Sequence, residues 1–113
     1  MSPSEVAALP RLHAGTAALA NVLAHLRDAQ EPNGEDTADA SLARAWMRER
    51  GWDVARGRGA GAHTDDERAG MLAGGLADAR GHRAVQPRDR ADAERALMPL
   101  RAAGFDVVRG VEG

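Results

Sequence analysis

Apolar residues in the first third of the chain recur at helical spacing and predict an amphipathic helix from about Pro10 to Ala29. They advance by nearly seven positions at a time, which suits an antiparallel helical hairpin or a dimer interface. We interpret them as an interaction stripe, because one small core would leave part of such a face uncovered. The stripe consists of Leu12, Leu19, Val22, Leu23 and Leu26.

Two ten-residue segments of similar sequence each predict a helix that ends at a glycine and leads into a short strand. They are residues 48–57 and residues 101–110, so matched positions lie 53 residues apart. Gly51 and Gly104 are placed to take the left-handed conformation that ends a helix, and an aromatic residue and a valine follow each of them. We therefore expect Val54 and Val107 to lie close together in one hydrophobic interior.

The rest of the pattern predicts further helices and one more strand. We expect a helix from about Asp39 to Arg50, a helix that begins at the capping sequence Thr64-Asp65-Asp66-Glu67, a short strand from His82 to Gln86 and a helix from about Asp89 to Ala103. Gly74 and Gly75 fall within the helix that begins near Thr64, where each costs about 1 kcal/mol relative to alanine. Close packing of that helix against a neighbour is the reason we expect for them.

Together these elements predict a single domain over residues 1–113, because ~100 to 150 residues is a common domain size. The predicted fold class is α/β or α+β. Two N-terminal helices within about residues 3–50 precede a small three-stranded β-α-β-α-β layer within about residues 51–110. This alternation favours a parallel or mixed sheet with right-handed crossovers. The alternative is a mostly α-helical bundle in which the predicted strands are extended connectors.

The composition limits both the core and the expected location of the protein. Alanine accounts for much of the 43% hydrophobic content, so large aliphatic side chains are few and their burial contributes less than usual. All 15 basic residues are arginine and cysteine is absent, which indicates a GC-rich genome and excludes disulfides. No apolar run approaches ~20 residues and no signal-peptide pattern is present, so we expect a cytoplasmic protein without a membrane segment.

A glycine-rich segment after the first predicted strand is a candidate ligand-binding loop. Its backbone N–H groups would approach a phosphate closely, and its arginines would add charge-assisted hydrogen bonds. The candidate residues are Arg56, Gly57, Arg58, Gly59 and Gly61. Their spacing, Arg-x-x-Gly-x-Gly, resembles the pyrophosphate loop of the acyl-CoA-dependent N-acetyltransferases. That resemblance implies binding of acyl-CoA or acyl transfer, and a nucleotide is the other phosphate ligand that the glycine spacing suggests.

Arginine and tryptophan are interleaved around the first predicted helix-to-strand turn. Arginine beside aromatic rings can stack on the bases of a single-stranded nucleic acid. The residues of this patch are Arg44, Trp46, Arg48, Arg50 and Trp52. A net charge of −2 argues against such a partner, since nucleic-acid-binding domains are usually strongly basic.

The sequence predicts no catalytic and no metal site. Its serines fall at helix starts, where capping explains them, and the acids that follow His63 complement the positive end of a helix. We therefore predict a small non-enzymatic protein-interaction domain, a regulatory or assembly subunit with a protein partner or a second copy of itself and without a cofactor. Binding of a phosphate-containing ligand at residues 56–61 and binding of nucleic acid are the alternatives.

Overall fold

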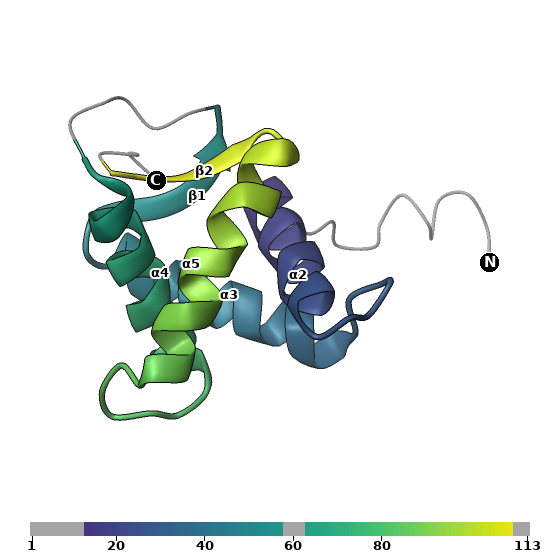
Figure 1. Cartoon of the computed structure of the whole chain (residues 1–113), viewed down its shortest axis with the longest axis horizontal. Coiled ribbons are helices and arrows are strands. Elements are labelled where there is room, and N and C mark those ends of the chain that lie inside the picture. Colours follow the sequence, from purple (N-terminus) through teal and green to yellow (C-terminus); the bar gives the residue numbers. More distant parts are fainter. Residues whose placement is uncertain (1–12, 58–62, 110–113) are drawn as a thin grey trace, which may run out of the picture.

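The computed structural model describes residues 13–57 and 63–109, and within them the chain combines helices with a small sheet. The elements are α2 (Ala14–Leu26), α3 (Gly34–Arg48), β1 (Trp52–Arg56), α4 (Asp65–Ala79), α5 (Pro87–Ala102) and β2 (Phe105–Arg109) (Figure 1). Leu12 and the other residues before 13 lie outside this description. No helix of the described part is long and apolar enough to cross a membrane.

The order of these elements is helix, helix, strand, and it occurs twice. A shift of 53 residues brings α3 onto α5 and β1 onto β2, and α2 then overlaps most of α4. The similarity that two short segments show in the sequence therefore extends over two whole halves of the molecule. We call residues related by this shift repeat mates.

The two halves meet in an antiparallel pair of strands, β1 and β2. Val54 lies opposite its own repeat mate Val107, and the neighbouring pairs of the ladder are also arranged symmetrically about these two valines. An approximate two-fold axis therefore passes through the middle of the sheet. Both valines are fully buried, which confirms that the two like-built segments share one interior.

The predicted three-stranded layer is not confirmed, since the sheet of the described residues has two strands that run antiparallel. His82 to Gln86 forms no strand. The N–H of His82 donates to the carbonyl oxygen of Ala77 at the end of α4, and Gln86 caps the start of α5. These backbone groups are used to end one helix and begin the next, so few remain for a strand ladder.

The helices lie on one side of the sheet, and their apolar faces enclose the core (Figure 1). Leu19, Leu72, Leu76 and Leu100 are fully buried there together with the two central valines. Helix caps determine where the helices start. Asn33 and Asp36 form a reciprocal capping box at α3, so that helix begins several residues earlier than the sequence predicted.

The two halves differ in how closely their helices approach each other. A Cβ atom on Gly74 would lie 2.1 Å from the ring of Trp46, and one on Gly75 would lie 2.8 Å from the carbonyl oxygen of Ala43. These glycines therefore allow α3 to pack tightly on α4, as the sequence predicted. The repeat mates of Gly74 and Gly75 are Asn21 and Val22, and α2 packs less extensively on α5.

Candidate ligand-binding cleft

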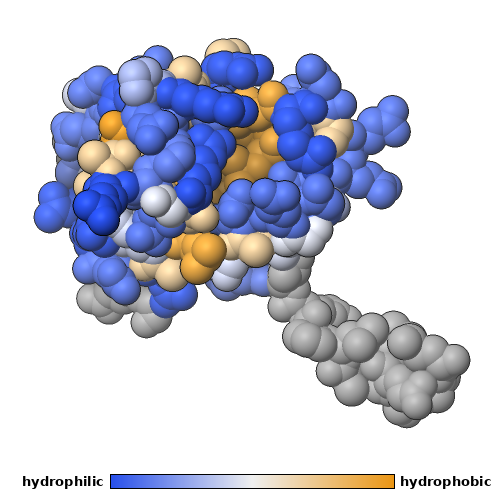
Figure 2. Space-filling view, turned by 90° about the horizontal axis from the view of Figure 1, so that it is seen from below, coloured by the Kyte–Doolittle hydropathy of each residue, from blue (hydrophilic) through white to orange (hydrophobic). Residues whose placement is uncertain are grey.

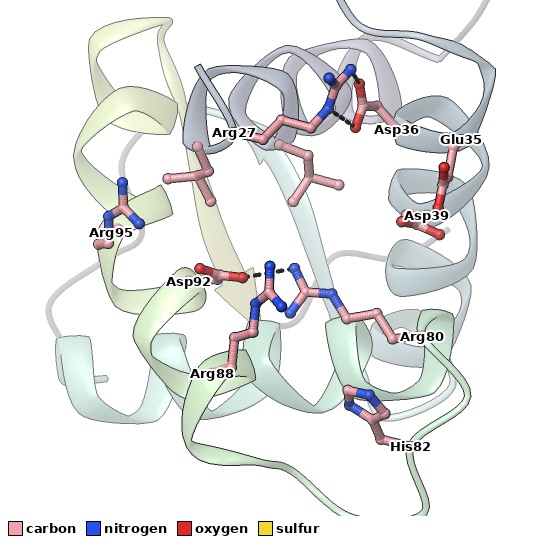
Figure 3. A pocket seen from close by; sticks show the side chains of 11 residues that line it. Arg27, Glu35, Asp36, Asp39, Arg80, His82, Arg88, Asp92 and Arg95 are labelled. Carbon is pink, nitrogen blue, oxygen red and sulfur yellow. Dashed lines mark hydrogen bonds and ion pairs between the residues drawn. The ribbon is translucent and has the colours of Figure 1, made fainter. Parts of the chain in front are cut away.

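A cleft of about 690 Å³ opens among the helices at the end of the molecule away from the sheet (Figure 3). Its lining is mostly charged and comes from α2 and the residue after it, from α3, from the segment after α4 and from α5. The lining residues are Leu23, Leu26, Arg27, Glu35, Asp36, Asp39, Arg80, His82, Arg88, Asp92 and Arg95. The cleft lies where α2 and α5 approach each other less closely than their repeat mates α4 and α3.

Two arginines at helix ends build the frame of this cleft. Arg27 follows α2, and its Nε and Nη2 donate to the two carboxylate oxygens of Asp36 at 3.1 and 2.5 Å. Its repeat mate Arg80 follows α4, and its Nη1 donates to Asp89 at 2.8 Å. In both halves a guanidinium thus joins the end of one helix to the first turn of the next at the edge of the cleft.

Asp89 is the most deeply buried of these carboxylates, with 0% of its side chain exposed. Burial raises its pKa, but hydrogen bonds from the Gln86 N–H, from His82 and from Arg80 outweigh that effect and lower the pKa overall. The pKa of Asp36 is lowered as well, chiefly by its hydrogen bonds with Arg27. Both carboxylates are therefore ionised near neutral pH and stabilise the fold through their hydrogen bonds. Neither is available as a proton donor at that pH.

Acid should destabilise the protein through these two carboxylates. The unfolded chain takes up protons near pH 4, whereas Asp36 and Asp89 take them up only at lower pH in the folded protein. Their contribution to the free energy of unfolding is therefore complete above that range and is lost as the pH falls through the lowered pKa values. Urea denaturation between pH 7 and pH 3 measures this loss, and Asp36→Asn should flatten the curve; an unchanged curve would contradict the assignment.

One turn further along, α3 and α5 each carry another carboxylate, and these two carboxylates differ in their hydrogen-bond partners. Asp92 of α5 accepts a hydrogen bond from Nη2 of Arg80 at 2.7 Å. Its repeat mate Asp39 of α3 has no hydrogen bond or ion pair through its side chain within the described residues. Burial and the nearby charge of Glu35 raise the pKa of Asp39, and they outweigh the charge of Arg80, which lowers it. Asp39 is thus a carboxylate at the cleft without the direct hydrogen bond to an arginine that its counterpart has, although the charge of Arg80 is near it.

The two sides of the cleft carry opposite charge. Glu35 on α3 and its repeat mate Arg88 on α5 are both exposed, and neither forms an ion pair in the part of the chain described. Arg95, two turns further along α5, likewise has no ion pair there and adds another positive charge where its repeat mate is Leu42. Figure 3 shows the acids of α3 facing the arginines across the open space.

Apolar side chains cover the part of the cleft between these charged walls. Leu23 is 7% exposed and Leu26 is partly buried, and both project from α2. Seen from the side opposite the sheet, the surface has a recessed hydrophobic area surrounded by hydrophilic side chains (Figure 2). The arrangement can hold a molecule with a cationic end, an apolar middle and an anionic end.

The stripe predicted from the sequence is used mainly inside the protein. Leu19, Val22 and Leu23 are buried in its own core, and Leu26 packs partly against that core. Leu12 lies outside the described residues. The stripe therefore offers little free surface to a partner, although two of its residues line the cleft.

The described part of the glycine-rich candidate segment, Arg56 and Gly57, lies at the end of β1, away from the cleft. Arg56 is exposed and places its guanidinium 5.0 Å from the ring of Phe105, and Gly57 has a φ of 96°. Arg58, Gly59 and Gly61 are outside the described residues. Phosphate binding at this segment stays a prediction.

The predicted arginine and tryptophan patch does not form one exposed face. Arg44 is buried, where it binds Asp53 through two hydrogen bonds of 2.8 Å and Thr16 through a third of 2.7 Å. Trp52 is buried as well. Trp46 is partly buried with the guanidinium of Arg50 stacked 3.7 Å above its ring.

The acids at the start of α4 have structural partners. Thr64 accepts a hydrogen bond from the N–H of Glu67, as the capping sequence predicted, and Glu67 contacts His63 at 3.0 Å. Asp65 binds Arg101 at the far end of α5. No group of side chains suited to holding a metal ion occurs within residues 13–57 and 63–109.

Comparisons with known proteins add no assignment, because no protein-family model, no curated protein and no solved structure matches this chain. A functional assignment therefore depends on the charges and contacts of the cleft.

Proposed function

We propose that this protein is a small non-enzymatic recognition domain, and that the charged cleft lined by α2, α3, α5 and the segment after α4 is its binding site. The observation that carries the proposal is the set of charged side chains around one open space that form no hydrogen bond or ion pair among the described residues. Glu35 and Asp39 lie on one wall and Arg88 and Arg95 on the other. Charged groups that find no partner within their own chain are available to a ligand or to a partner protein.

Binding is favoured over catalysis by the chemistry of the lining. The lining contains no hydroxyl or thiol side chain that could act as a nucleophile. The Nδ1 atom of His82 is 2.9 Å from Asp89, which is itself held by Arg80 and by the N–H of Gln86, so this histidine serves the structure. A regulatory or assembly role through contact with another protein agrees with this chemistry, with the cleft in place of the leucine stripe as the contact site.

Charge reversal on one wall tests the proposal. Arg88→Glu changes an exposed side chain at the cleft, and Arg83→Glu changes an exposed arginine outside it, so both variants should fold as the wild type does. A thermal-shift screen with compounds that carry both a positive and a negative charge should find at least one that stabilises the wild type and the Arg83→Glu control but not the Arg88→Glu variant. Equal responses of all three proteins would remove the cleft as the binding site.

A further inference from the structure

A comparison of the two halves of the repeat indicates which chemical group would bind in the cleft. In one half, Asp92 receives the guanidinium of Arg80 at 2.7 Å. In the other half, the corresponding guanidinium belongs to Arg27, and it is already committed to both oxygens of Asp36. Asp39, the repeat mate of Asp92, forms no such hydrogen bond within the described residues, although the charge of Arg80 is near it. A guanidinium from outside the chain would complete the pair.

We infer that the cleft binds a small ampholyte of the arginine class, with a guanidinium seated on Glu35 and Asp39 and a carboxylate seated on Arg88. This inference rests on the proposed function and names its ligand. Glu35 and Asp39 are four residues apart on α3, so they lie on the same face of the helix and offer acceptors to a planar, multiply donating cation. A metal ion fits less well, because Asp36 is already occupied by Arg27.

The opposite wall explains why the ligand must also carry a negative charge. Arg88 stands at the position of Glu35 in the repeat, so the approximate two-fold symmetry of the cleft is broken by a reversal of charge. Arg95 reinforces the positive wall. A guanidinium forms two parallel hydrogen bonds with a carboxylate, which gives the site direction as well as affinity. A molecule with a cation alone would leave these arginines without an anion.

The space between the walls suits an aliphatic chain. Leu23 and Leu26 lie over the gap, and the methylene groups of an arginine-like molecule would pack against them while its two ends reach water-exposed charges. The volume of about 690 Å³ lies within the range of ~300 to 1,000 Å³ that is common for small-molecule sites. A single amino acid and a few ordered waters would fit.

Titration calorimetry of the full-length protein with three probes tests the inference. L-arginine carries both groups, agmatine lacks the carboxylate, and citrulline replaces the guanidinium with a neutral group of similar shape. We expect L-arginine to bind at least about tenfold more tightly than either analogue, since each loses a charge-assisted contact worth ~1.5 kcal/mol or more. If agmatine binds as tightly as L-arginine, or if L-arginine does not bind at millimolar concentration, the inference is wrong.

Variants of the cleft separate this inference from the proposed function. Asp39→Asn should weaken L-arginine binding by about tenfold or more while raising the melting temperature of the free protein, because a desolvated charge is removed. Asp78→Asn, at an exposed position outside the cleft, should change neither. Glu35→Arg makes the two walls alike and should abolish binding. If L-arginine does not bind but another charged compound stabilises the wild type and not the Arg88→Glu variant, the inference about the ligand is wrong and the proposed binding function is supported.

Discussion

Replacing Asp89 with alanine should lower the free energy of unfolding by about 3 kcal/mol, a large part of the stability of a small domain. This carboxylate is fully buried and accepts hydrogen bonds from Arg80 and from the N–H of Gln86. Its removal leaves the N–H of Gln86 unsatisfied and takes one of two partners from a guanidinium that is only 26% exposed. Urea denaturation at pH 7 measures the loss.

The repeat offers a matched control for this variant. Asp36→Ala removes the equivalent carboxylate, but its partner Arg27 is 47% exposed and is more easily rehydrated. We expect Asp36→Ala to cost about 1 to 2 kcal/mol, a loss clearly smaller than that of Asp89→Ala. Equal losses, or a loss below ~1 kcal/mol for Asp89→Ala, would show that burial of the Arg80 partner is not the cause.

The second large effect is expected from Gly15→Ala, which should cost about 2 to 3 kcal/mol. Gly15 lies in the first turn of α2, and a Cβ atom there would sit 2.3 Å from the carbonyl oxygen of Val54 in β1. A main-chain oxygen cannot rotate away as a side chain can, so either α2 or β1 must move. Thermal and urea denaturation should both show the loss.

Gly34→Ala provides the control, because it also lies in the first turn of a helix but has no atom within 4 Å of the added methyl group. Its expected effect is within about 0.5 kcal/mol of zero, since nothing in the fold must shift. If both variants are equally stable, the close approach of α2 to the strand is not a constraint on the fold. If both lose ~2 kcal/mol, the loss comes from alanine at helix starts and not from the contact with Val54.

Local sequence signals predicted much of the fold. The glycines at 51 and 104 take positive φ angles of 83° and 88° and separate helix from strand, as their positions indicated. The capping sequence at Thr64 and the close packing at Gly74 and Gly75 were likewise predictable, because each depends on neighbours a few residues away or on the size of one side chain.

The sheet was predicted less well because strand pairing depends on distant parts of the chain. Alternating strand and helix signals favoured a parallel or mixed sheet, and residues 82–86, which end before Pro87, resemble a short strand. In the structure Val85 is 47% exposed in a segment that joins two antiparallel helices. So short a run cannot by itself distinguish a strand from a helix connection.

The cleft was missed, although the sequence contains a signal for it. The charged residues that frame it recur at the same shift of 53 as the strand segments: Arg27 with Arg80, Asp36 with Asp89, and Asp39 with Asp92. Following the repeat beyond the strands would have grouped these residues. It would not have shown that Asp39 forms no hydrogen bond with an arginine, because that depends on Arg27 donating to both oxygens of Asp36.

The antiparallel pairing of Val54 with Val107 has a consequence for how the molecule comes apart. Each half contributes one strand, which pairs only with the strand of the other half within the described residues, and α3 of the first half packs more extensively on α4 of the second than on any other described element. We therefore expect neither half to stay folded once the other half has unfolded. Heating should therefore produce a single calorimetric peak, whose van't Hoff enthalpy equals the heat absorbed.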